Sequence, residues 1–252
     1  DEYNRHFLNF HPFITVVTNI ETDHLDYFKD LDDILNAFDQ LLAESENKIV
    51  DYKKYLEKIP PLMVPGEHNR MNASAAFAVA DFLKIPEDLS RGTLAKFSGT
   101  WRRLDKRGIT KEGTIIYDDY AHHPTEIRAS LEALREIYPK GEKNLTVLFQ
   151  PHLYSRTKAL FEDFTKCFGD ADKVLLLPIY FAREKKDESV SSEKLAEAMA
   201  IDGVEAQAFS DFGSAERMVF SFGLGPKDVF VTMGAGEAYL VADKVFPDVK
   251  LG

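Results

Sequence analysis

Hydrophobic positions in the second part of the chain alternate between short continuous runs and sets with helical spacing. Continuous apolar runs predict buried parallel strands, and apolar residues every three or four positions predict amphipathic helices. The predicted strands cover residues 114–117, 145–149, 173–177, 204–209 and 228–232, and the helices that follow them cover 124–138, 157–168, 191–200, 211–222 and 236–245. Five successive strand–helix units indicate an α/β fold with a Rossmann-like parallel sheet.

The first part of the chain has a different pattern. An apolar run predicts a buried strand over residues 13–20, and helical spacing predicts helices over 31–42, 69–83 and 86–97. The sequence SGT at 98–100 breaks the last pattern, and the charged run 102–107 indicates a linker or hinge. We therefore expect two domains, with the boundary near residues 99–113.

Composition narrows the class of protein. The 252 residues carry a formal net charge of -11, which argues against nucleic acid or an anionic membrane as a partner, although a nucleotide needs only a few local cations. The single cysteine, Cys167, cannot form an internal disulfide, which favours a reducing compartment such as the cytoplasm. No apolar stretch has the length of a membrane span, so membrane insertion is not expected.

The most concentrated chemistry follows the predicted strand 114–117. The string DDYAHH at 118–123 gathers two carboxylates, a phenol and two imidazoles before Pro124, which suits the first turn of a helix. Open α/β sheets bind ligands between a strand end and the next helix. His152 and Arg156 follow the next strand, so they are predicted at the same edge, as candidates to hold a carboxylate.

Other strings carry weaker signals, each with a structural alternative. ETDHLD at 21–26 suits Mg²⁺ or a solvated loop, and PGEHNRMN at 65–72 places two asparagines on one helix face, for adenine or for helix capping. Arg102 and Arg103 suit phosphate or a charged linker. MGAGE at 233–237 resembles a phosphate-binding turn, although tight packing explains its glycines equally well.

Together these strings resemble the Mur ligases of peptidoglycan synthesis. The matching strings are TNIETDH at 18–24, PGEHNRMNA at 65–73, GTWRR at 99–103, DDYAHHPTE at 118–126 and FQPH at 149–152. They follow the family's order and cover nearly the whole chain. Within the family they match the branch that joins L-alanine to UDP-N-acetylmuramate through an acyl phosphate, with ATP and Mg²⁺.

The resemblance also implies a domain assignment. Residues 1–98 would be the C-terminal part of the central ATP-binding domain, and residues 99–252 the Rossmann-like domain that binds the amino acid. The UDP-sugar domain and the P-loop would lie upstream of residue 1. The chain is therefore expected to be a fragment that is inactive alone and that self-associates through its truncated sheet.

Roles for single residues follow from the same resemblance. His24 would ligate Mg²⁺, Arg103 would contact the ATP phosphates, and Asp119 would hold the ribose hydroxyls. Adenine would be bound by His68, Asn69 and Asn72. The L-alanine pocket would contain Tyr120 and His122, with His152 and Arg156 steering carboxylates. Many family members carry an arginine where this chain has Leu153.

Three alternatives stay open. A recycling ligase that attaches a ready-made tripeptide to the same sugar shares the string at 118–124, but it lacks FQPH, which favours the alanine branch. A non-catalytic module that binds nucleotide or amino acid would account for the missing P-loop sequence. A metal hydrolase built on His122 and His123 is disfavoured, because adjacent residues rarely aim both imidazoles at one ion.

Overall fold

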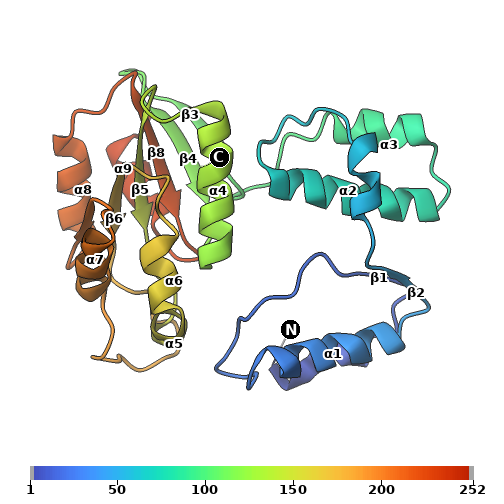
Figure 1. Cartoon of the computed structure of the whole chain (residues 1–252). Helices are drawn as coiled ribbons and strands as arrows, with labels where there is room; N and C mark the ends of the chain where they lie inside the picture. Colours follow the sequence, from blue (N-terminus) through green and yellow to red (C-terminus); the bar gives the residue numbers. More distant parts are fainter. Residues whose placement is uncertain (1–2, 250–252) are drawn as a thin grey trace. The chain divides into compact units, whose positions relative to one another are not determined.

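A six-stranded sheet forms the centre of the unit that begins at Gly99, as a computed structural model describing residues 3–249 shows (Figure 1). Its order is β3-β4-β8-β5-β6-β7, and every neighbouring pair is parallel except β3 with β4. The strands are β3 (Asp105–Ile109), β4 (Ile115–Asp119), β5 (Asn144–Phe149), β6 (Lys173–Leu176), β7 (Ala206–Ala208) and β8 (Asp228–Met233). The predicted α/β fold with a Rossmann-like sheet is confirmed.

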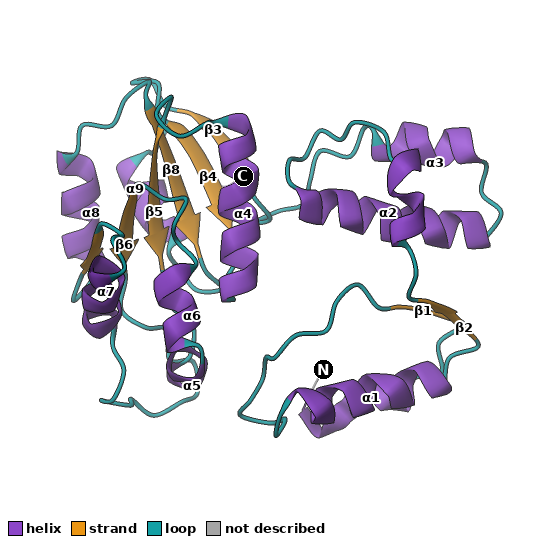
Figure 2. Ribbon diagram, viewed as in Figure 1, coloured by secondary structure: helices purple, strands orange, loops and turns teal. Residues whose placement is uncertain are grey.

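Helices cover both faces of this sheet (Figure 2). They are α4 (Pro124–Ile137), α5 (Tyr154–Ala159), α6 (Phe161–Lys166), α7 (Ser192–Ile201), α8 (Phe212–Ser221) and α9 (Tyr239–Val245). Successive strand residues face opposite ways, so Tyr117 packs with α4, α6 and α7, whereas Ile116 packs with α8 and α9. The sheet therefore separates two apolar cores.

Two predictions for this unit were wrong. The charged run 102–107 was expected to be a linker, but part of it forms β3, an antiparallel edge strand. Edge strands tolerate charged side chains because one side of the strand faces solvent. The single helix predicted over 157–168 is two short helices, α5 and α6, interrupted at Leu160, whose φ of -108° and ψ of 24° are not helical.

The unit that ends at Ser98 is built from short elements around small cores. They are two 3₁₀ segments, η1 (Tyr3–Asn9) and η2 (Lys53–Lys58), strands β1 (Ile14–Val16) and β2 (Asn47–Ile49), and helices α1 (Leu31–Ala43), α2 (Glu67–Phe82) and α3 (Glu87–Leu94). The strand predicted over 13–20 is reduced to the three residues of β1, because its partner β2 offers only three positions for pairing.

None of the helices within residues 3–249 combines the length and the apolar character needed to cross a membrane.

Candidate active site

The carboxyl ends of β4, β5, β6 and β8 meet at one edge of the sheet, and the turns that follow them form a polar site. Gln150 N donates to Met233 O (3.0 Å) and Leu177 N donates to Phe149 O (2.9 Å), so these turns begin side by side. Ligands of open α/β sheets bind at such an edge. Five of the residues predicted for the site lie at the end of β4, in these turns or directly after them: Asp119, Tyr120, His122, His152 and Arg156.

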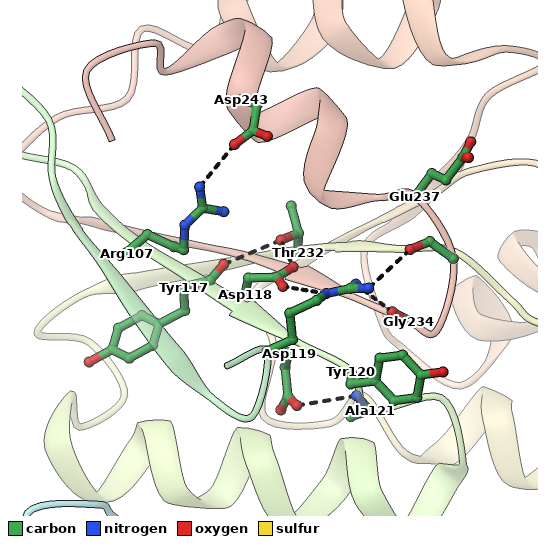
Figure 3. A network of polar contacts seen from close by, with 12 residues as sticks. Arg107, Tyr117, Asp118, Asp119, Tyr120, Ala121, Thr232, Gly234, Glu237 and Asp243 are labelled. Atoms are coloured by element: carbon green, nitrogen blue, oxygen red, sulfur yellow. Dashed lines mark hydrogen bonds and ion pairs between the residues drawn. The ribbon is translucent and has the colours of Figure 1, made fainter. Parts of the chain in front are cut away.

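The two carboxylates that end β4 lie in different environments. Asp118 is fully buried and accepts hydrogen bonds from Arg102 Nε (2.7 Å) and Thr232 Oγ1 (2.5 Å) (Figure 3). Asp119 is 3% exposed, and its Oδ1 accepts from Ala121 N (3.2 Å), whereas its buried Oδ2 has no hydrogen-bond partner among residues 3–249. Burial raises the pKa of Asp119 to about 6 because it disfavours the charged form.

The two adjacent arginines also differ. Arg102 is buried, and besides Asp118 it donates to Gly234 O (2.8 Å) and Gly236 O (3.3 Å). The Arg102 guanidinium therefore links the turn after β8 to the end of β4, and it donates its hydrogen bonds to groups of the protein itself. Arg103 is half-exposed, with Nη1 3.6 Å from Glu126 Oε1. Of the pair, Arg103 is therefore the one whose guanidinium is exposed to solvent.

The start of α4 orients the two histidines of the DDYAHH string differently. Nδ1 of His123 accepts from Thr125 N (3.3 Å), and Glu126 Oε2 accepts from His123 N (3.2 Å), so His123 caps the helix. Nδ1 of His122 lies 2.9 Å from Tyr120 O and 3.4 Å from Glu126 Oε2. Because a carbonyl only accepts, Nδ1 carries the proton, and Nε2 is the acceptor of the neutral ring.

A row of four aromatic rings crosses the edge from the turn after β4 to the segment after β6. The ring of Tyr120 meets that of His122 edge-on at 5.3 Å, and His122 meets His152 edge-on at 5.9 Å. His152 in turn stacks on Tyr180, with 5.3 Å between centroids and 13° between planes. Burial lowers the pKa of His152 to about 4, together with the charge that His122 carries when protonated and the charge of Arg156. His152 is therefore neutral near pH 7.

The glycines of the MGAGE string pack closely against Gln150. A Cβ on Gly234 would lie 2.6 Å from Gln150 O, and a Cβ on Gly236 would lie 2.2 Å from Gln150 Oε1. Gln150 Oε1 also accepts from Glu237 N (2.6 Å), and Gly234 N donates to Asp119 O (3.0 Å). The backbone N–H groups of residues 234 and 237 thus already donate hydrogen bonds within the protein and are not available to a phosphate. This supports the packing explanation over a phosphate-binding turn.

The remaining predicted residues belong to the unit that ends at Ser98. His68, Asn69 and Asn72 lie in the first turns of α2, where Asn69 Nδ2 donates to Pro65 O (2.7 Å) and Asn72 is exposed. His24 has a positive φ of 52°, and its Nε2 lies 3.6 Å from Asp23 Oδ2. Within the described part of the chain, no three side chains of His, Cys, Asp or Glu gather as a metal site.

Sequence reasoning missed the contribution of Tyr180 to this edge. Tyr180 lies just beyond β6, and a rule that collects polar residues after every parallel strand would have included it. It was overlooked because the string LLLPIY at 175–180 looks like an extension of the core.

Comparison with known proteins finds two family models. The model described as the Mur ligase glutamate ligase domain matches residues 102–236, and the model of the Mur ligase middle domain matches residues 2–59. The UDP-N-acetylmuramate–L-alanine ligase of Clostridium acetobutylicum is 37% identical over 292 aligned positions, covering 96% of this chain and 62% of the relative. The chain therefore spans less than two thirds of that relative, which also carries residues inside the aligned region that this chain lacks.

Two solved structures share the fold. The UDP-N-acetylmuramate–alanine ligase of Thermotoga maritima matches with a TM-score of 0.74 and 21% identity, covering 97% of this chain and 61% of that one. The MurF ligase of Thermotoga maritima, solved in complex with ADP, matches with a TM-score of 0.64 and 15% identity, covering 97% and 63%.

Proposed function

The chain belongs to the Mur ligase family, and on this premise we propose that it is part of a ligase that joins L-alanine to UDP-N-acetylmuramate. The observation that carries the proposal is the row formed by Tyr120, His122 and His152 in a chain 37% identical to a ligase named for those substrates. ATP would activate the sugar carboxylate as an acyl phosphate, which the amine of L-alanine would attack. The inactivity of the 252-residue chain alone stays a prediction.

His122 is proposed to take a proton from the amine of L-alanine. Amide formation requires a neutral amine, so the ammonium group of L-alanine must lose a proton before it attacks. The Nδ1–H of His122 is directed to Tyr120 O at 2.9 Å, which makes Nε2 the basic nitrogen. Glu126, with Oε2 3.4 Å from Nδ1, stabilises the imidazolium that forms when Nε2 takes the proton.

His152 and Arg156 are proposed to hold carboxylate groups. A guanidinium can only donate, so the contact of 3.4 Å between Arg156 Nη1 and His152 Nδ1 makes Nδ1 the acceptor. Neutral His152 then carries its proton on Nε2 and is a hydrogen-bond donor there. A donor imidazole beside a buried guanidinium suits a carboxylate, and Tyr120 with His122 would line the rest of the L-alanine pocket.

Asp119 is proposed to bind the ribose hydroxyls of ATP. Its buried Oδ2 makes no hydrogen bond of full geometry among residues 3–249, although the Ser130 side chain is close enough to lower the pKa of the carboxyl. A buried carboxyl oxygen gains most from a well-aligned hydroxyl donor. Arg103 would contact the phosphates, and His68, Asn69 and Asn72 would bind adenine. The ADP complex of the MurF relative supports the proposal that a nucleotide binds.

For Mg²⁺, this chain offers His24 as the proposed ligand. These small-molecule substrates also suit the proposed cytoplasmic location.

Calorimetric titration of the 252-residue chain with L-alanine, and separately with the peptidoglycan tripeptide, tests the proposal. We expect L-alanine to bind and the tripeptide not to bind. The variant His122→Ala should weaken L-alanine binding at least about tenfold, a loss of about 1.4 kcal/mol, whereas His11→Ala, at an exposed histidine, should not. Binding of the tripeptide alone would favour the recycling branch, and binding of neither ligand would contradict the proposal.

A further inference from the structure

Tyr180 is attached to the turn that carries His152 through both its backbone and its ring. Tyr180 N donates to Pro151 O and Leu153 N donates to Tyr180 O, both at 2.8 Å, so the two hydrogen bonds bracket His152. Between them, the phenol ring lies almost parallel to the imidazole, with 13° between the planes. The phenol and the imidazole therefore form one stacked pair at the sheet edge.

Few other contacts determine the plane of the His152 ring. Its one hydrogen bond among the residues that the structure describes is the contact of 3.4 Å from Arg156 Nη1, which is long for a hydrogen bond. His122 touches the ring only edge-on, at 5.9 Å between centroids. An imidazole held at one nitrogen by a weak bond can still rotate, so the parallel stack on Tyr180 is the contact that fixes its plane.

Tyr180 itself is held in place by its own segment. Pro178 O accepts from Gln150 Nε2 (3.3 Å), and Glu184 accepts hydrogen bonds from the backbone N (3.1 Å) and the side chain of Ser155. The segment after β6 is thus tied to the turns after β5 on both sides of Tyr180. These ties also explain how Leu153 keeps a positive φ of 70°, a strained conformation that persists only where surrounding contacts impose it.

We infer that Tyr180 is a positioning residue for the proposed ligation: its ring fixes the plane of the His152 imidazole and so the direction in which Nε2 donates to a substrate carboxylate. The catalytic meaning of this role rests on the proposed function, whereas the stacking itself does not. Tyr180 contributes by orienting His152 before the substrate arrives, which lowers the entropy that binding must otherwise remove.

The test is a pH titration of the His152 ring by NMR in the 252-residue chain and its variants. Tyr180→Ala should move the pKa of His152 upward from about 4 toward its ordinary value of 6.5, because solvent then reaches the ring. The charges of His122, Arg156 and Glu184 remain around it, and the first two still oppose protonation. Tyr180→Phe keeps the flat ring and should leave the pKa unchanged, as should Phe181→Ala at the exposed neighbouring aromatic.

An unchanged pKa in a folded Tyr180→Ala protein would overturn the inference. If that variant does not fold, the unaltered chain decides, because parallel stacking predicts ring-current shifts and nuclear Overhauser effects between the rings of Tyr180 and His152. Their absence would equally overturn the inference.

The affinity for L-alanine is a separate measurement that tests the proposed function. Tyr180→Ala should weaken its binding about tenfold or more, and Tyr180→Phe should not. Failure of L-alanine to bind the unaltered chain would count against the proposed function while leaving the stacking result intact.

Discussion

At the scale of single residues, adjacent side chains at the carboxyl edge of the larger sheet have different partners. Asp118 and Asp119 are neighbours of the same type, yet Asp118 is paired with Arg102, whereas Oδ2 of Asp119 has no hydrogen-bond partner within residues 3–249. The difference arises because adjacent strand residues face opposite ways, and only the fold shows what lies on each side. The two adjacent histidines also differ: the side chain of His123 caps α4, whereas that of His122 does not.

The buried Asp119 carboxyl predicts a pH-dependent stability. Its folded-state pKa, about 6, lies above the ordinary 3.8, so its stabilising contribution is complete below pH 3.8 and is lost as the pH rises through 6. Asp119→Asn should therefore raise the free energy of unfolding at pH 7.5, by up to about 3 kcal/mol, and change it little at pH 3.5. Urea unfolding at both pH values measures this. Asp163→Asn, at an exposed carboxylate, is the control, and equal effects at both pH values would contradict the prediction.

At the scale of elements, periodicity predicted the strand–helix units well because each buries a clear apolar face. Periodicity failed where contacts with other segments of the chain determine how long an element is or where it begins. The run 13–20 is apolar enough for a long strand, but β2 pairs with only three of its residues. The helix predicted over 236–245 begins instead at Tyr239, because the preceding turn is held by Arg102 and Gln150. Such long-range contacts leave little trace in local sequence.

The turn after β8 predicts a large difference between two glycine substitutions. Gly234→Ala would bring a Cβ within 2.6 Å of Gln150 O at a φ of 129°, so the backbone must shift. We expect a loss of about 2 kcal/mol or more in the free energy of unfolding. Gly169→Ala, where a Cβ meets nothing within 4 Å, should cost little. Thermal unfolding of both variants tests this, and equal stability would show that the turn adapts easily.

At the scale of the whole molecule, apolar burial is uneven between the two units. Many large side chains, such as Phe149, Leu175 and Phe230, are fully buried in the unit that begins at Gly99, and each contributes about 2 kcal/mol. The unit that ends at Ser98 has only small buried clusters, such as that of Phe28, Ile34 and Ala37. The sequence predicted a partial domain there, but not how its short elements would divide the apolar residues among separate clusters.

Hydrogen exchange should therefore differ between the units. Amides of β4, β5 and β8 are expected to exchange most slowly, because they lie at the centre of the larger sheet between two apolar cores. Amides of α1 and α2 should exchange faster. Mass-spectrometric exchange on the intact chain measures both, and equal protection of α1 and β5 would refute this view of where stability resides.

The carboxyl edge of the larger sheet is proposed to bind the amino acid that the ligase would use. The most direct measurement is an NMR titration of the 252-residue chain with L-alanine, observing every histidine ring. We expect saturable shifts at His122 and His152, with none at His11, an exposed histidine of the other unit. Saturable binding of L-alanine that leaves both His122 and His152 unmoved would contradict it.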